Sequence, residues 1–212
     1  MTALKKPLCG IMAFILVFAF VFATPISVFA DDETTERPLT PAEIELNKET
    51  DEDTGLEYIK IDLGSAIEIV GYSGTATEIE VPKKIGNLSV VSIGEGAFEG
   101  NTTIKTVELN NNVLTIKDNA FKDCTALVSI DNFKALEEIG VSAFEGCTSL
   151  TSFKLPDAVT NIPSRCFVNC TSLAEIDVHK NIKGVANDAL IGSAYQNNQA
   201  NGPLCLGRIL YS

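Results

Sequence analysis

The chain has 212 residues, a length that fits one domain or at most two small ones. It carries 16 basic and 28 acidic side chains, so its net charge is −12 at pH 7. This acidity argues against nucleic acid as a partner, because proteins bind phosphate backbones through clusters of Lys and Arg. The single His excludes multi-histidine metal sites and most histidine-based acid–base catalysis.

Residues 1–30 have the pattern of a secretory signal peptide. Two lysines precede an almost unbroken apolar run over residues 8–23, and Val28-Phe29-Ala30 places small residues at the −3 and −1 positions. The alternative is a transmembrane helix of about 20 apolar residues, but Pro25 follows the run and a basic stop-transfer cluster does not. We therefore expect cleavage after Ala30 and a secreted or cell-surface protein that does not insert in a membrane afterwards.

Residues 31–55 are rich in acidic residues, Thr and Pro, and contain few large apolar side chains. Such a segment buries too little surface to offset chain entropy, so the sequence predicts an acidic disordered linker. Within it, Thr40-Pro41-Ala42-Glu43 is able to start one short helical turn. The acidic cluster at residues 51–53 lacks the glycine and the terminal Glu of a calcium loop, which favours solvated charge over Ca²⁺ binding.

A repeat of 23 residues dominates the rest of the chain, and six columns of residues keep this step. The columns are Phe98, Phe121, Phe144, Phe167 and Leu190; Ile93, Ile116, Ile139, Ile162 and Val185; Ala97, Ala120, Ala143, Cys166 and Ala189; Cys124, Cys147 and Cys170; Ile104, Leu127, Leu150 and Leu173; and Val107, Ile130, Phe153 and Ile176. One unit cannot bury its own apolar stripe. Stacked units can, and the columns then become ladders of like side chains.

The stretch Leu150-x-x-Phe153-x-Leu155 alternates as a strand with one buried face does. The Ala-Phe pair lies in a short segment that suits one helical or 3₁₀ turn. Stacked strands form a parallel sheet with rungs about 4.8 Å apart. Asp131-Asn132-Phe133 departs from the apolar-Pro strand end of the other units, which puts the register of that rung in question.

The pattern L-x-x-I-x-L-P…V-x-x-I-G-x-x-A-F-x-x-C resembles the BspA-like leucine-rich repeat family of bacterial surface and secreted proteins. The resemblance covers five units of about 23 residues over residues 77–193. It implies a leucine-rich repeat solenoid with a parallel β-sheet on one face and turns or short helices on the other. Residues 56–76 resemble an N-terminal β-hairpin cap. Residues 194–212 resemble a C-terminal cap or a truncated continuation, and their abrupt end favours a fragment of a longer protein.

Five cysteines remain once the signal segment with Cys9 is removed, and an odd count in a secreted protein suggests disulfides with one free thiol. Three of the five share one repeat column, so we favour small buried residues in a ladder. Zinc requires sulfurs that converge on one point, whereas stacking sets them in a row. Cys166 and Cys170 can approach each other on a helical turn. Cys205 lies outside the ladder and is the candidate for a reactive thiol.

The sequence predicts neither an enzyme nor a cofactor or metal site. Gly71-Tyr72-Ser73-Gly74 lacks the spacing of a nucleophile elbow. The glycines at 94, 96 and 100 do not have dinucleotide-binding spacing. An unrecognised catalytic site would require an activity that is lost on changing Asp131, Asp177 or His179.

The residues between the ladder positions of each strand point outward and form a candidate protein-binding face. Its members are Glu78, Glu80, Thr106, Glu108, Ser129, Asp131, Phe133, Ser152, Lys154, Glu175, Asp177 and His179. Because six of them are acidic, the face repels phosphate and sulfated glycans and prefers basic or neutral partners. An outward Phe133 provides an apolar anchor. The alternative is a merely solvated sheet face.

The resemblance implies protein–protein interaction or adhesion, with an extracellular or surface protein of a host or a neighbouring cell as the partner. The alternative function is a structural spacer or scaffold module of a larger cell-surface protein.

Overall fold

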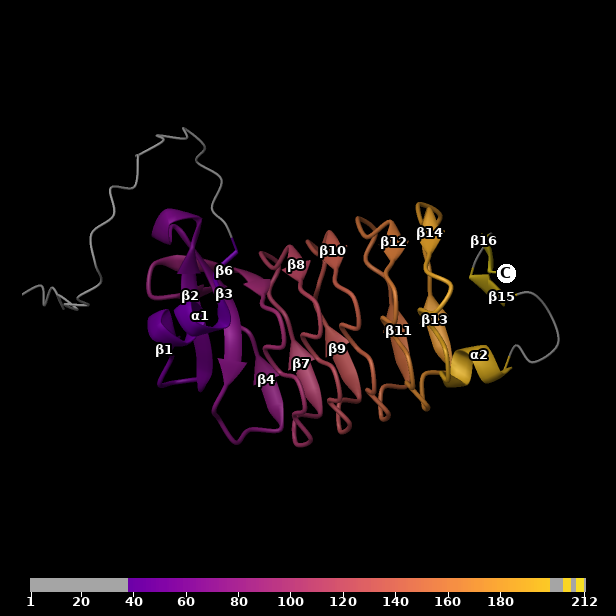
Figure 1. The fold of residues 1–212 in the computed structure, drawn as a ribbon, viewed down its shortest axis with the longest axis horizontal. Coiled ribbons are helices and arrows are strands. Elements are labelled where there is room, and N and C mark those ends of the chain that lie inside the picture. Colours follow the sequence, from indigo (N-terminus) through magenta and orange to yellow (C-terminus); the bar gives the residue numbers. More distant parts are fainter. Residues whose placement is uncertain (1–37, 199–203, 207–208, 212) are drawn as a thin grey trace, which may run out of the picture. The chain divides into compact units, whose positions relative to one another are not determined.

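The computed structural model describes residues 38–198, 204–206 and 209–211. Most of residues 78–193 form stacked coils, which follow an N-terminal hairpin (Figure 1). The predicted signal peptide and its cleavage after Ala30 lie outside these residues. In the part of the chain that is described, no helix combines the length and the apolar character needed to cross a membrane.

The predicted disordered linker is wrong for residues 38–55. Helix α1 (Pro41–Asn47) begins with a capping box, in which the Thr40 hydroxyl accepts from the N–H of Glu43 and the Glu43 carboxylate accepts from the N–H of Thr40. Strand β1 (Glu49–Thr50) then pairs antiparallel with β2 (Leu56–Ile61). The capping box and the strand pairing give this segment regular structure although it buries few apolar side chains. Neither interaction can be predicted from amino-acid composition.

A β-hairpin caps the N-terminal end of the stack, as the resemblance implies. Strand β2 pairs antiparallel with β3 (Ala66–Tyr72) across the 3₁₀ turn η1 (Asp62–Gly64), and β3 pairs parallel with β6 (Leu88–Ile93) of the first coil. Glu68 of β3 is buried, and its carboxylate lies 2.6 Å from Lys117 Nζ in the second coil. This ion pair fastens the cap to the stack.

The predicted parallel sheet is confirmed. Strands β4 (Glu78–Glu80), β7 (Thr106–Glu108) and β9 (Ser129–Asp131) form one parallel ladder, and β11 (Ser152–Lys154) and β13 (Glu175–Asp177) form a second. The central residue of each strand is buried. Strands β9 and β11 do not pair, so the hydrogen-bonded ladder is interrupted after β9. Asn132, which follows β9, adopts a φ of 63°, and it lies in the segment where the sequence departs from its repeat.

A different set of short parallel strands runs along another side of each coil, where the sequence analysis expects no sheet. Strands β8 (Thr115–Ile116) and β10 (Glu138–Ile139) extend the sheet of β6, and β12 (Asn161–Ile162) pairs with β14 (Gly184–Val185). Strand β5 (Lys84–Ile85) pairs antiparallel with β6. Two-residue strands are too short to show alternation, so the repeating Ile column is their only signal in the sequence.

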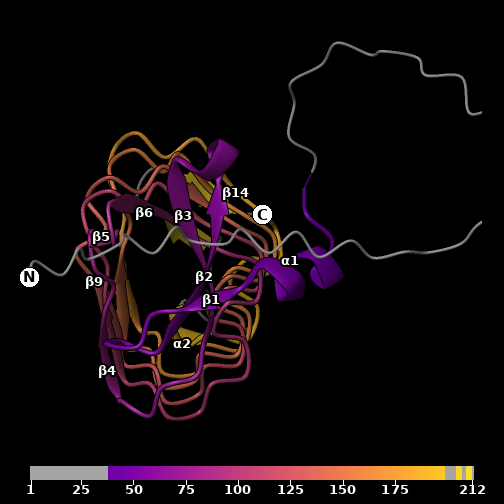
Figure 2. The ribbon, with the colours of Figure 1, turned by 90° about the vertical axis from the view of Figure 1, so that its left-hand side faces the viewer.

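The third side of each coil, hereafter the turn side, consists of tight turns that carry the Ala-Phe pair. Backbone hydrogen bonds join successive turns, for example from Phe98 N to Ala120 O at 2.8 Å and from Phe121 N to Ala143 O at 2.8 Å. The turns close on residues with positive φ, such as Gly100 at 72° and Gly146 at 74°. Glycine adopts this conformation without steric cost. Viewed along the stack, the coils follow one another on nearly the same outline (Figure 2).

The core is the predicted stack of aromatic rings. The centroids of Phe98, Phe121, Phe144 and Phe167 are 5.0, 5.5 and 5.6 Å apart, and successive ring planes differ by 3°, 2° and 7°. All four rings are buried. Each ring covers the faces of its neighbours, so each coil depends on the adjacent coils to bury its ring.

Beyond the last coil lie helix α2 (Ala194–Asn198) and a hairpin of β15 (Leu204–Leu206) with β16 (Ile209–Tyr211). Helix α2 rests on the stack, because the N–H groups of Ala194 and Tyr195 donate to the carbonyls of Cys170 and Leu173. Residues 194–198 thus cover part of the C-terminal end.

We predict that Phe144→Ala lowers the free energy of unfolding by about 3–5 kcal/mol, because it empties the centre of the ring stack. Lys154→Ala is the control. Its side chain is 78% exposed, so a cost below about 0.5 kcal/mol is expected. Urea denaturation of both variants measures the difference, and equal costs would contradict the assignment of inner and outer faces.

Candidate functional site

The structure brings ten of the twelve residues predicted for the binding face together on the outward side of the strands. We call this surface the strand face. Its members are Glu78, Glu80, Thr106, Glu108, Ser129, Asp131, Ser152, Lys154, Glu175 and Asp177. Each pair flanks a buried central residue, because successive side chains of a strand point to opposite faces. All are exposed except Thr106 and Ser129, which are half-buried.

Three carboxylates of the strand face lie in register on neighbouring strands. Glu80 pairs with Glu108, and Glu108 pairs with Asp131 across the ladder. Neighbouring rungs are about 4.8 Å apart, and like charges directly opposite one another destabilise a sheet. Within residues 38–198, no Lys or Arg forms an ion pair with any of the three, although the Asn132 amide approaches Glu108 at 3.5 Å. The strand face therefore keeps uncompensated negative charge.

The same column continues with a mixed pair. Lys154 of β11 is in register with Asp177 of β13, and Nζ lies 3.9 Å from the carboxylate. Both side chains are more than half exposed, so this ion pair contributes little to stability. The uncompensated charge is consequently concentrated on β4, β7 and β9.

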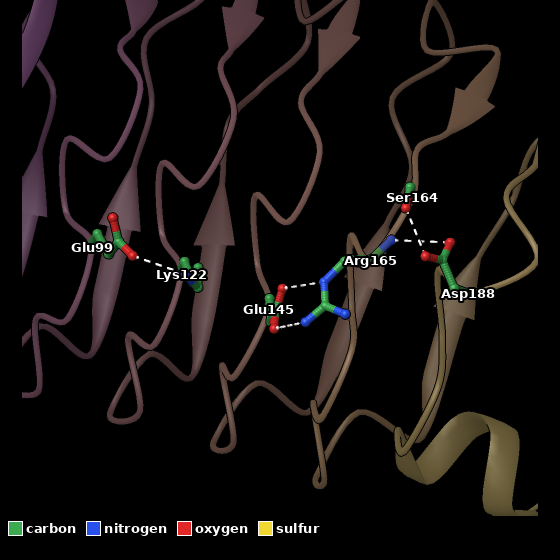
Figure 3. Close-up of polar contacts among 6 residues, drawn as sticks. All are labelled: Glu99, Lys122, Glu145, Ser164, Arg165 and Asp188. Carbon is green, nitrogen blue, oxygen red and sulfur yellow. Dashed lines mark hydrogen bonds and ion pairs between the residues drawn. The ribbon is translucent and has the colours of Figure 1, made fainter.

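The turn side has the opposite arrangement, with charges of alternating sign on successive coils (Figure 3). Lys122 Nζ lies 3.0 Å from Glu99 Oε1. Further along, both oxygens of Glu145 accept from the guanidinium of Arg165, and the backbone N–H of Arg165 donates to Asp188 Oδ1 at 3.4 Å. Glu99 and Glu145 on the turn side are thus compensated within the chain, which sets these two carboxylates apart from those of the strand face.

Phe133 is not the outward anchor that the sequence suggests. It is half-buried against the core, and its ring stacks on Phe153 with centroids 5.5 Å apart and planes inclined by 18°. The departure of this unit from the repeat pattern turns the ring inward, where apolar burial stabilises it.

His179 lies beyond the end of β13 and serves the local backbone. Its Nδ1 accepts from the N–H of Asn181 at 3.1 Å, and its Nε2 lies 3.0 Å from the carbonyl oxygen of Val159. A neutral ring with its hydrogen on Nε2 satisfies both contacts. His179 is therefore a turn-stabilising residue at the margin of the strand face.

Pockets lie elsewhere on the molecule. One of about 700 Å³ is bounded by the segment before α1, the hairpin cap and Lys117, and another of about 250 Å³ lies beside Thr115 and Glu138. Neither includes a residue of the strand face. Among the described residues, groups of three or more His, Cys, Asp or Glu side chains suited to a metal ion do not occur.

The cysteines of the repeat are small buried residues in a ladder, as the sequence analysis favours. Cys124, Cys147 and Cys170 are buried free thiols, and each donates to the carbonyl of a Phe in the preceding coil at 3.0–3.1 Å. Cys166 is also buried and free. Burial raises the pKa of Cys124 and of Cys170 to about 12, and it also raises the pKa of Cys147 and Cys166. These thiols are structural, because the reactive species is the thiolate.

We predict that these four thiols stay unlabelled by an aromatic disulfide reagent at about pH 8 in the folded protein and react once it is denatured. Thr171→Cys is the positive control, because residue 171 is exposed next to the column. Mass spectrometry of labelled peptides identifies the sites. Fast labelling of Cys147 in the folded state would contradict the buried column.

Glu145 links the turn side to the acid stability of the protein. Burial by itself raises the pKa of its carboxyl, but hydrogen bonds from Arg165 and Ser142 outweigh this, and the pKa is lower than usual. A lowered pKa in the folded state stabilises the protein above the unfolded value of about 4.3. This stabilisation is lost as the pH falls through the folded value.

We therefore expect the stability difference between the wild type and Glu145→Gln to be largest near neutral pH and to shrink below about pH 4. Urea denaturation between about pH 7 and pH 3 measures it. Glu137→Gln, at an exposed carboxylate, is the matched control and should show a smaller change with pH. A difference that grows in acid would exclude the Glu145–Arg165 pair as its source.

The sequence analysis missed the ion pairs of the turn side, although a signal exists. Positions 99, 122 and 145 form a 23-residue column with the charges minus, plus, minus. Arg165 stands outside that column, and only the folded coil brings its side chain to Glu145.

The chain is similar to known proteins in sequence and in fold. A family model described as the BspA type leucine rich repeat region matches residues 72–196 in six copies, where the Phe column predicts five units. The solved structure of a T. pallidum leucine rich repeat protein is 28% identical with a TM-score of 0.60, over 65% of this chain and 64% of that one. A leucine rich cell surface protein from Faecalibacterium prausnitzii A2-165 is 21% identical with a TM-score of 0.57, over 75% and 48%.

A leucine-rich repeat protein from Bacteroides capillosus ATCC 29799 is 19% identical with a TM-score of 0.53, over 63% of this chain and 99% of that chain. The part of the T. pallidum protein and of the F. prausnitzii protein that this chain matches is less than two thirds of the length of each. Among curated protein sequences, none matches the chain.

Proposed function

Because the chain belongs to the BspA-type leucine-rich repeat family, we propose that it is a secreted or cell-surface protein that binds another protein through its strand face. The signal-peptide pattern of residues 1–30 supports export, with cleavage after Ala30. The F. prausnitzii protein of similar fold is named a cell surface protein, which agrees with this location. The partner is an extracellular or surface protein of a host or a neighbouring cell, and the binding serves adhesion.

One observation carries the proposal, namely the uncompensated row of Glu80, Glu108 and Asp131. Three carboxylates in register on a sheet cost stability, and the turn side shows that this fold accommodates compensating Lys and Arg. A partner that presents Lys or Arg opposite the row removes the repulsion when it binds. The partner is therefore a protein with a basic surface.

A second candidate function is a spacer or scaffold module of a larger surface protein. The continuous ring stack favours a rigid support. The two functions differ in one measurable property, because a spacer has no saturable partner of its own.

We predict that the mature chain binds at least one protein of a panel of immobilised extracellular matrix proteins, and that Glu108→Lys with Asp131→Lys weakens binding at least about tenfold. The matched control is Glu137→Lys with Glu138→Lys, which reverses two exposed carboxylates at strand β10 and just before it, away from the strand face. Biolayer interferometry gives the Kd, and added salt should slow association.

Loss of binding in both double variants would assign the effect to net charge alone. Binding that ignores the Glu108 and Asp131 reversals would remove the strand face from consideration. A panel without any saturable binder would favour the spacer.

A further inference from the structure

Strand β4 lies at one edge of the sheet that carries the strand face, and it is bonded to a neighbour on one side only. It pairs with β7, and within the described residues no strand pairs with its other side. The N-terminal cap does not supply a partner for this side, because β3 pairs with β6 in another sheet. Figure 1 accordingly shows β4 as the first strand of the row that continues with β7 and β9.

The backbone groups of Glu78 and Glu80 point away from β7. Their neighbours along the chain show this, because the C=O of Thr77 and the N–H of Val81 both bond to the coil of β7, at 2.6 and 2.8 Å. Alternate residues of a strand direct their N–H and C=O groups to opposite sides. In the part of the chain that is described, the N–H and C=O groups of Glu78 and Glu80 therefore form an unpaired strand edge. We call it the β4 edge.

The side chains beside the β4 edge select the charge of any strand that pairs with it. Glu78 and Glu80 are exposed on either side of the buried Ile79. Their partners in register on β7 are Thr106 and Glu108, neither of which is basic. Side chains on the same face of adjacent strands lie about 4.5–5.5 Å apart. An added strand with Lys or Arg at every second position therefore supplies the opposite charge at both carboxylates.

The same carboxylates disfavour a second copy of this chain at the β4 edge. Pairing two β4 edges would bring Glu78 and Glu80 of both copies together, and like charges on adjacent strands destabilise a sheet. Charged residues on a short edge strand are a common protection against such self-association. The β4 edge thus rejects its own kind and accepts a strand of opposite charge.

We propose that the β4 edge takes up an extended, basic segment of the partner protein as an added strand of the sheet. This inference rests on the proposed protein-binding function of the strand face and specifies how the basic partner is held. Backbone hydrogen bonds to Glu78 and Glu80 bind an extended chain of any sequence, and the two carboxylates select Lys or Arg at alternate positions. Recognition then depends on backbone pairing as well as on charge.

A synthetic peptide, Lys-Thr-Lys-Val-Lys-Thr-Lys with blocked ends, tests the proposal by NMR titration of the isotope-labelled mature chain at low salt. We expect shift changes and slower hydrogen exchange at the amides of Glu78 and Glu80. The amide of Val81, which already bonds to the coil of β7, is the internal control and should keep its exchange rate. The same peptide N-methylated at all its central residues keeps the charge but lacks the N–H donors. It should bind at least about tenfold more weakly.

Two variants of one residue separate backbone pairing from charge in the protein itself. Glu80→Gln and Glu80→Pro both remove the carboxylate, but only Pro removes the N–H of the β4 edge. Proline is tolerated in an edge strand where the N–H faces solvent. We expect Glu80→Pro to bind the unmethylated peptide at least about fivefold more weakly than Glu80→Gln does. Thermal unfolding of both variants checks that they fold.

Amides of Glu78 and Glu80 that do not respond to the peptide would overturn the inference, as would equal binding of the two peptides or of the two variants. Matrix-protein binding that is lost on reversing Glu108 and Asp131 but is equal in Glu80→Gln and Glu80→Pro would also overturn it, and would leave the proposed function intact. The expected peptide results in a chain without a matrix-protein partner would support the β4 edge and remove adhesion. Dimers of the free chain that Glu80→Pro abolishes would assign the edge to a second copy.

Discussion

Each coil of this protein buries its apolar stripe only against the coil before it and the coil after it. Rings 5.0–5.6 Å apart with nearly parallel planes run through four coils, and the cysteine thiols donate to the carbonyls of the same phenylalanines. A side chain that breaks this spacing loses contacts on both faces at once. The requirement for like residues at each step explains why the columns are so regular.

Residues that point outward are not subject to this packing requirement. The turn side and the strand face differ in the charges that they carry at such positions. On the turn side, opposite charges alternate and compensate one another, as Glu145 and Arg165 do. On the strand face, Glu80, Glu108 and Asp131 repeat the same sign without compensation. The fold tolerates both arrangements, so the acidity of the strand face is not a structural necessity. This contrast between the two surfaces makes the strand face the better candidate for binding a protein partner.

The two ends of the stack require capping elements, whereas each interior coil is covered by its neighbours. At the N-terminal end, the hairpin of β2 and β3 extends the sheet of β6, and the ion pair of Glu68 with Lys117 ties it to the second coil. At the C-terminal end, α2 covers the half of the last coil that contains Leu173. An open end exposes core side chains and strand edges, which is a liability for any repeat protein.

The period, the inward columns and the strands of the strand face were predictable from the residues alone, because every stacked unit has to meet the same packing requirement every 23 residues. The sequence also placed ten of the twelve predicted face residues, since alternation along a strand assigns each to a side. Four features became apparent only in the folded chain: the short strands that extend the sheet of β6, the helix and strand within residues 40–50, the inward ring of Phe133 and the backbone contacts of His179. Phe133 and His179 depend on single contacts with segments distant in sequence, and such contacts leave no periodic trace. The capping box of Thr40 is local but is one side-chain contact that composition does not reveal, and the two-residue strands are too short to show alternation.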